Sequence, residues 1–154
     1  MISPINSEVK TLYFILSGTA RHYFRNADNE EITIWISEAG GLSTDYGAFT
    51  RGVPTQYEIQ AITDVAGVAI DSDNLNELYD RYKNFERLGR LINQQYLNDF
   101  IDRNNFLINN SAKERYRILL DQKPHWFNTI PLKHLASYLA VTVETLSRLR
   151  SNTY

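Results

Sequence analysis

The chain has 154 residues, of which 43% are hydrophobic and 22% are charged, a composition typical of one ordinary globular domain or two small ones. It contains no cysteine, which excludes disulfides, thiolate metal sites and thiol nucleophiles. No apolar run approaches the roughly 18 residues of a membrane span, and the N-terminus has no apolar signal segment. We therefore expect a cytoplasmic protein without membrane association.

Charge is divided unevenly along the chain. Residues 1–110 hold 9 Lys and Arg against 15 Asp and Glu, whereas residues 111–154 hold 7 against 3. The net charge is thus −6 in the first part and +4 in the second. A basic C-terminal segment on an acidic body suggests a polyanion as partner, with chance unevenness in a short segment as the alternative.

Residues 11–70 have the pattern of short antiparallel strands. TLYFILSG ends at Gly18, TARHYF follows, and ITIWIS alternates so that Ile32, Ile34 and Ile36 would share one face. A polar turn near 26–30 predicts a hairpin. After a short helical turn expected at 46–49, QYEIQAI and VAGVAI return to strand. We predict an α+β fold with an antiparallel, jelly-roll-like β-roll over residues 1–83.

From residue 72 the apolar period becomes helical, with Ser72 or Asp73 as candidate cap of a short helix. A longer helix is expected from about Asn84 to Leu107. Its apolar stripe consists of Phe85, Leu88, Ile92, Tyr96 and Phe100. We interpret residues 84–109 as a connecting and dimerisation helix that uses this stripe. A helix that simply packs across the barrel is the alternative.

Residues 110–154 read as a second module. Its first helix, capped by Asn110 or Ser111, directs Lys113, Arg115 and Arg117 largely outward, and QKPHWFNTIP is expected to be a loop. Two short amphipathic helices follow, at 132–139 and 143–150, joined by a turn at 140–142. Thr142 is the candidate cap of the second helix, whose apolar stripe would consist of Val143, Leu146 and Leu149. This spacing predicts a helix-turn-helix.

The outer face of the last helix carries side chains that can hydrogen-bond to bases and phosphates. They are Thr142, Glu144, Thr145, Ser147, Arg148 and Arg150. An ordinary helical hairpin with solvated arginines is the alternative interpretation.

The stretch IPLKHLASYLAVTVETLSRLR resembles the helix-turn-helix of the Crp/Fnr family of bacterial transcription regulators, particularly the form common in Bacteroidetes. The family motif E-T-hydrophobic-S/G-R is met by residues 144–148. YFILSGTARHYF resembles its roll, and FERLGRLINQQYLNDFIDR its central dimer helix. The resemblance runs from about residue 10 to about residue 151. It implies a homodimer bound to double-stranded DNA, with Glu144 and Arg148 reading bases, an unknown small-molecule effector, and RNA polymerase as a candidate partner.

The candidate effector pocket departs from the family pattern. The family holds a cyclic phosphate with an Arg-Ser/Thr pair, and those positions fall here on Thr55 and Gln56, neither of which is cationic. Arg51 lies nearby in a loop, and the cassette also includes Asp45 and Phe49. We therefore predict that the protein does not respond to cAMP and needs no cofactor. With a single histidine in the roll, His22, we also expect no metal site.

Further departures concern the DNA-binding module and the chain ends. Val143 stands where the family often has arginine, Ala140 where the turn often has glycine, and no wing follows the last helix before Tyr154. Family members usually begin with a helix and further roll strands, so we expect either a misassigned start or an incomplete roll. We expect a regulator rather than an enzyme, since no nucleophilic constellation is present. The alternative is a small-molecule-binding β-roll protein whose helical tail contacts other proteins without binding DNA.

Overall fold

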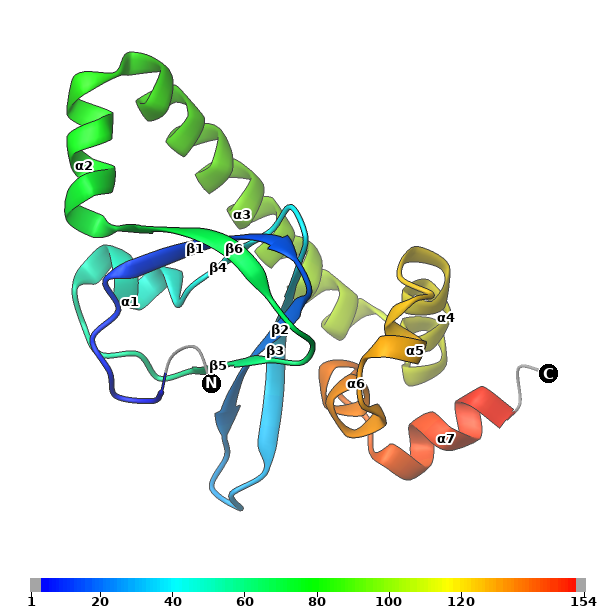
Figure 1. The fold of residues 1–154 in the computed structure, drawn as a ribbon. Helices are drawn as coiled ribbons and strands as arrows, with labels where there is room; N and C mark the ends of the chain where they lie inside the picture. The colour runs from blue at the N-terminus through cyan, green and yellow to red at the C-terminus, as the bar shows by residue number, and fades with distance from the viewer. Residues whose placement is uncertain (1–3, 152–154) are drawn as a thin grey trace. The chain divides into compact units, whose positions relative to one another are not determined.

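The computed structural model describes residues 4–151 and divides into two compact units, within residues 1–83 and 84–154 (Figure 1). The first unit contains two antiparallel sheets of three strands each. One sheet has the order β4-β1-β6, formed by Leu42–Ser43, Thr11–Ser17 and Ala66–Asp71. The other has the order β3-β2-β5, formed by Glu31–Glu38, Thr19–Arg25 and Glu58–Ala61. The predicted antiparallel β-roll is confirmed.

Two helices belong to the same unit, α1 at Tyr46–Arg51 and α2 at Ser72–Arg81. The cap of α2 is Asp71, because its carboxylate accepts a hydrogen bond from Asn74 N at 2.8 Å. The prediction of Ser72 or Asp73 as the cap is therefore wrong by one or two residues. Asp71 is the last residue of β6, and its carboxylate already bonds an amide of the first turn of α2, so that neither Ser72 nor Asp73 acts as the cap.

Strand β3 contains a bulge that changes which side chains face the core. His22 pairs with Trp35, but the next residue, Tyr23, pairs with Thr33, so Ile34 is an extra residue in β3. A bulge of this kind shifts the alternation of side chains by one position. Ile32 and Ile36 therefore lie on opposite faces, and the prediction that they share one face with Ile34 is wrong.

His22 connects the two sheets from inside the roll. Its Nε2 lies 2.9 Å from Ser43 Oγ on β4 and 3.2 Å from Ser37 Oγ on β3. Burial lowers the pKa of His22 to about 4, although the negative charge of Asp45 acts in the opposite direction. The ring is therefore neutral near pH 7 and serves as a polar link between the sheets.

The opposite face of β2 carries a buried cation. Arg21 is 1% exposed, and its guanidinium donates hydrogen bonds to Gln60 Oε1 at 2.8 Å, to Thr33 Oγ1 at 3.3 Å and to Glu31 Oε2. It also stacks on the ring of Tyr23 at 3.9 Å from the centroid. Because a buried charge is tolerated only when it is paired, these contacts are what permit Arg21 at this position.

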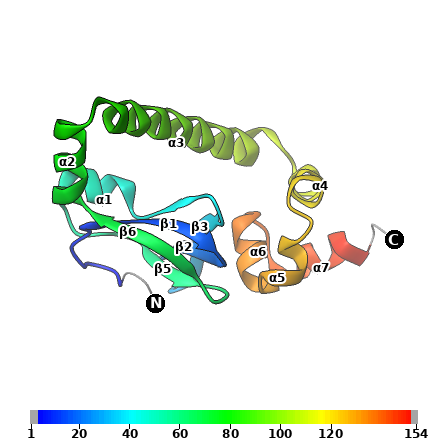
Figure 2. The ribbon, with the colours of Figure 1, turned by 45° about the horizontal axis from the view of Figure 1, so that its top comes forward.

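The second unit is helical (Figure 2). Its helices are α3 (Lys83–Asn109), α4 (Ala112–Gln122), α5 (Trp126–Thr129), α6 (Leu132–Tyr138) and α7 (Val143–Ser151). Ser111 caps α4 in a capping box with Glu114, one of the two predicted caps. The short α5 lies within the stretch predicted as a loop. No helix within residues 4–151 combines the length and hydropathy required to cross a membrane.

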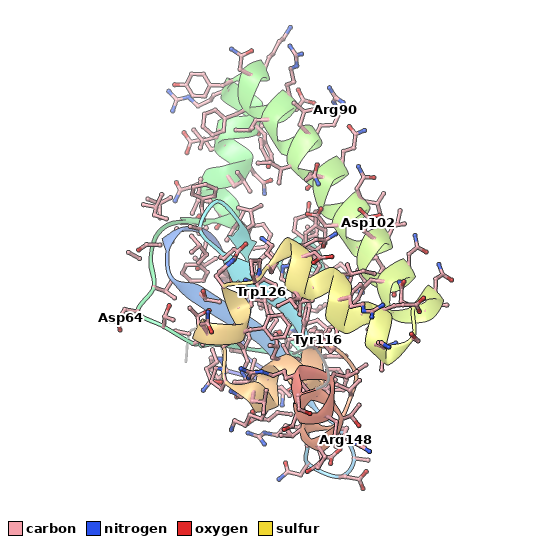
Figure 3. The ribbon with its side chains drawn as sticks, turned by 90° about the vertical axis from the view of Figure 1, so that its right-hand side faces the viewer. Asp64, Arg90, Asp102, Tyr116, Trp126 and Arg148 are labelled. Carbon is pink, nitrogen blue, oxygen red and sulfur yellow. The ribbon has the colours of Figure 1, made fainter. Side chains whose placement is uncertain are left out.

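Aromatic side chains form much of the core of the helical unit. Tyr116 packs edge-on against Phe127, and Trp126 packs edge-on against Tyr138, each pair with centroids 5.4 Å apart. Figure 3 shows Tyr116 and Trp126 on α4 and α5. Trp126 explains why the expected loop is helical, since one turn of α5 places its ring in this core.

We predict that His22 makes stability depend on pH. Its pKa in the folded chain is about 4, below the ordinary value of 6.5, so the unfolded chain binds a proton first as the pH falls. The neutral His22 ring therefore contributes up to about 3 kcal/mol to the free energy of unfolding. This contribution is fully present above pH 6.5 and is lost as the pH falls towards 4. Urea unfolding across this range should show that His22→Gln flattens the profile. His125→Gln, at an exposed position, is the matched control. A slope as steep as that of the parent protein after His22→Gln would contradict the assignment, whereas a smaller slope from carboxylates with lowered pKa should remain.

Candidate nucleic-acid interface

The turn between α6 and α7 closes the first of the two helices. Val141 N donates to Ala136 O, and Ala140 N donates to Ser137 O, both at 3.0 Å. This pair of bonds is the Schellman arrangement of a helix C-terminus, which requires a left-handed residue. Ala140 supplies it at φ +51°, at a cost of about 1 kcal/mol or more that glycine would avoid.

Helix α7 begins directly after this turn and is anchored on one side. Thr142 Oγ1 accepts a hydrogen bond from Thr145 N at 3.2 Å and so caps the helix, as predicted. Leu146 is fully buried and Leu149 is partly buried, whereas Val143 is 39% exposed. The apolar stripe is therefore narrower than expected, and most of the remaining surface of α7 faces solvent.

The predicted DNA-contacting side chains lie together on this surface. Five of them are exposed and Thr145 is partly buried; the five are Thr142, Glu144, Ser147, Arg148 and Arg150. Thr145 Oγ1 accepts hydrogen bonds from Thr142 Oγ1 at 3.2 Å and from Arg148 Nη2 at 3.4 Å. Thr145 thereby connects the cap of α7 to the guanidinium of Arg148, which Figure 3 shows on α7.

Glu144 is held in its ionised form. Its own backbone N–H and the Thr142 hydroxyl lower the pKa of this carboxyl, and Arg148 adds a smaller effect in the same direction. An anion and a cation therefore stand on adjacent turns of the exposed surface. Such a pair offers a hydrogen-bond acceptor and a donor fork to the edges of base pairs.

Two arginines, Arg103 and Arg115, connect the turn to the rest of the helical unit through contacts that the sequence does not predict. Arg115 was predicted to point outward, and this is wrong: its guanidinium donates to backbone carbonyls, including that of Leu139 at 2.8 Å. Arg103 of α3 donates through Nη2 to Tyr138 O and stacks on the Tyr138 ring at 3.7 Å. Burial, and to a lesser extent the charge of Arg115, lower the pKa of Arg103. No sequence signal identifies these contacts, because the partners are backbone atoms 24 and 35 residues away.

The predicted effector cassette is assembled around Asp45 in the first unit. Asp45 caps α1 through Oδ1, which accepts from Ala48 N at 3.0 Å, and its Oδ2 accepts from Thr55 Oγ1 at 2.8 Å. Thr55 Oγ1 in turn accepts from Tyr57 N at 3.0 Å. Phe49 packs in the core beside Val9 and Ala48.

The remaining two residues of the cassette do not join this cluster. Arg51 is exposed and donates from Nε to Gly47 O at 2.8 Å, along its own helix, and Gln56 is exposed. The structure therefore brings Asp45 and Thr55 together, with Phe49 in the core nearby, and leaves the only cationic member of the predicted set on the surface.

Comparison with protein families identifies the first unit. The family model for the cyclic nucleotide-binding domain matches residues 5–82, which is half of the chain. The chain belongs to the cyclic nucleotide-binding domain family. The match ends where α3 begins and so covers both sheets, α1 and α2.

Solved structures extend the likeness of this chain to known proteins into the helical unit. FixK2 from Bradyrhizobium japonicum is 17% identical, with a TM-score of 0.81 over 98% of this chain and 78% of that chain. The c-di-GMP responsive global regulator CLP of Xanthomonas campestris is 18% identical, with a TM-score of 0.74 over 99% and 81%. A transcriptional regulator described as of the Crp/Fnr family, from Eubacterium rectale, is 15% identical, with a TM-score of 0.68 over 95% and 72%.

Identities this low show a shared fold alone. The fold expected from the resemblance to Crp/Fnr regulators is nevertheless confirmed along nearly the whole chain. No curated protein sequence matches the chain.

The cassette of this cyclic nucleotide-binding domain does not fit a cyclic phosphate. A phosphate requires a cation and available hydrogen-bond donors. Here the buried charged group is the Asp45 carboxylate, and the Thr55 hydroxyl donates to it. Arg51, the only cation of the set, is bonded to its own helix. Among residues 4–151, moreover, no three His, Asp or Glu side chains are grouped as metal ligands.

We predict that Thr55→Val destabilises the protein by about 2 kcal/mol, because it leaves a buried carboxylate oxygen and the Tyr57 amide without their partner. Chemical denaturation measures the change. Thr50→Val is the matched control, since the Thr50 hydroxyl is exposed and bonds only along its own helix. Equal effects of the two substitutions would show that the Asp45–Thr55 pair has no special importance.

Proposed function

We propose that this protein is a sequence-specific DNA-binding transcription regulator of Crp/Fnr type, which acts in the cytoplasm as a homodimer and does not respond to cAMP. The observation that carries the proposal is α7, which buries Leu146 on one side and exposes Glu144, Ser147 and Arg148 on the other. A helix-turn-helix uses its second helix in this way in the major groove of DNA.

The exposed side chains of α7 suit direct reading of bases. Arg148, oriented by Thr145, can donate two hydrogen bonds to guanine, and the ionised Glu144 can accept one from cytosine. The hydroxyls of Thr142 and Ser147 and the cation of Arg150 can bind phosphate and so fix the position of the helix. Val143 supplies no such bond, which leaves most of the discrimination to two residues.

Two copies are needed because one short helix reads only a few base pairs. A two-fold dimer places two such helices about 34 Å apart, on successive turns of a pseudo-palindromic site. We propose that α3 provides the dimer interface, since it exposes many large apolar side chains.

The apolar residues of α3 form two faces rather than one. Leu88 and Leu97 are nine residues apart, as are Ile92 and Ile101, and this separation places the members of each pair on opposite sides of a helix. Phe85, Leu88 and Ile92 of the stripe predicted from the sequence define the first face, whereas Phe100, the last residue of that stripe, lies between the two faces. Leu97, Ile101 and Ile108 define the second face, which lies in the C-terminal half of α3 and is exposed.

We propose that the second face joins the two copies. Leu97, Ile101, Asn104 and Ile108 follow one another at intervals of four, three and four residues, which is the spacing of a coiled-coil seam. Asn104 donates one amide hydrogen to Phe100 O at 2.9 Å along its own helix. Its second amide hydrogen and its side-chain oxygen can still bond to Asn104 of the other copy across a two-fold axis. A single polar position of this type fixes register and favours two strands.

The domain family implies a small-molecule effector, but the cassette offers a phosphate no buried cation. We propose that the roll either takes an effector of different chemistry or serves a structural role. The support is the hydrogen bond between Asp45 and Thr55, because it bonds two of the predicted ligand-contact residues to each other.

We predict that the intact protein enriches a palindromic site from a randomised duplex library. Arg148→Ala should lose most of this preference, since each bidentate base contact contributes about 1–3 kcal/mol of discrimination. Arg117→Ala, an exposed arginine on α4, is the matched control and should keep the preference with slightly weaker binding. The absence of any enrichment at low salt would refute DNA recognition and favour a role in protein contact.

We also predict that Leu97→Glu converts the dimer to monomer in sedimentation experiments, because it places a charge in the seam. Leu88→Glu makes the same chemical change on the opposite side of α3 and should leave the dimer intact. Dissociation by Leu88→Glu alone would assign the interface to the stripe predicted from the sequence. A monomeric parent protein would refute the homodimer.

A further inference from the structure

Arg115 is bonded to four backbone carbonyls from two helix ends. Its Nη1 donates to Leu107 O at 3.2 Å and to Asn110 O at 2.8 Å, at the end of α3. Its Nε donates to Leu139 O at 2.8 Å, and its Nη2 to Ala140 O at 3.3 Å, just after α6. One side chain on α4 thus connects the end of the long helix to the turn that precedes α7.

These four acceptors are groups that need an outside partner. The last carbonyls of a helix have no donor within the helix, and they carry the negative end of its dipole. A guanidinium is suited to this position because it is always charged and holds several donors in a fixed plane. Arg115 thus supplies one charge and four hydrogen bonds to carbonyls at two helix ends.

Arg103 adds a second connection between the same elements. It lies in the last two turns of α3, donates through Nη2 to Tyr138 O and stacks on the Tyr138 ring. Two of its nitrogens, Nε and Nη1, are buried without a hydrogen-bond partner among the described residues. Arg103 is therefore the less well satisfied of the two arginines, and Arg115 provides the stronger connection.

We propose that Arg115 is a positioning residue that joins the end of α3, the start of α4 and the α6–α7 turn into one rigid block. The part of this inference that concerns DNA rests on the proposed function. If α3 holds two copies together, a rigid block fixes the distance and direction between their two α7 helices. Arg115 then determines which spacing of half-sites the dimer accepts, although it contacts no base.

The first test needs no DNA. Because the chain has no cysteine, spin labels can be attached at Asn98→Cys on α3 and Ser151→Cys on α7, both exposed positions. Labelled chains are diluted with unlabelled ones, and the distance distribution within one chain is measured by pulsed electron resonance. Arg115→Met should broaden a narrow distribution, and Arg117→Met on the same helix should leave it narrow.

A second variant keeps this test decisive if Arg115→Met does not fold. Arg115→Lys retains the charge, but a single ammonium cannot reach four carbonyls at two helix ends, so it should also broaden the distribution. A distribution as narrow as that of the parent, in whichever Arg115 variant folds, would overturn the proposal.

The second test measures spacing on DNA. The parent dimer should bind tightly at one half-site spacing and lose affinity when one base pair is inserted, since the insertion both shifts and rotates one half-site. With Arg115→Lys this loss should shrink, while affinity for a single half-site stays the same; an undiminished loss would contradict the positioning role. If the parent has no sequence preference, the proposed function fails, and the label distances still decide whether Arg115 makes the block rigid.

Discussion

The helical unit depends on how the ends of α3 and α6 are satisfied. Both helices end in carbonyls that need a donor, and the guanidinium of Arg115 supplies hydrogen bonds to both. The same turn requires a left-handed residue, a role that Ala140 takes at some cost. Leu139 and Leu146, both fully buried, complete the packing on either side of this turn. The exposed face of α7 is therefore a consequence of how α6 ends.

The roll has retained the fold of its family while its cassette has a different chemistry. Asp45 caps α1 and accepts a hydrogen bond from Thr55. The carboxylate of Asp45 is thus the anion at the N-terminus of α1, in the cassette where the family holds a phosphate. Nearby, His22 and Arg21 show that buried polar groups of this roll are bonded to one another. His22 links the two sheets, and Arg21 is paired with Glu31. We consider these networks to be structural, because their polar groups are bonded to one another within the roll.

The sequence was most informative where local patterns determine structure. The strands, the long helix, the α6–α7 turn and the Thr142 cap follow from periodicity and capping rules. It was less informative where distant backbone atoms decide. The bulge at Ile34 depends on pairing with β2, and the helical turn of α5 depends on the core that the Trp126 ring enters. Arg115 lies on the outer side of α4 in a helical projection, but its guanidinium donates to the carbonyl of Leu139, 24 residues away. Glu144, Ser147, Arg148 and Arg150 on the exposed side of α7 were named from the sequence, whereas the contacts of Arg103 and Arg115 that hold the turn before α7 were not.

The central claim is that the outer face of α7 is the surface that meets DNA. The most direct measurement is an NMR titration of the isotopically labelled protein with a duplex selected from a random library, followed at each backbone amide. The account predicts that the largest shifts fall on residues 142–148, with smaller changes at Lys113 and Arg117. Large shifts confined to the β-roll, or none on α7 at saturating DNA, would contradict it.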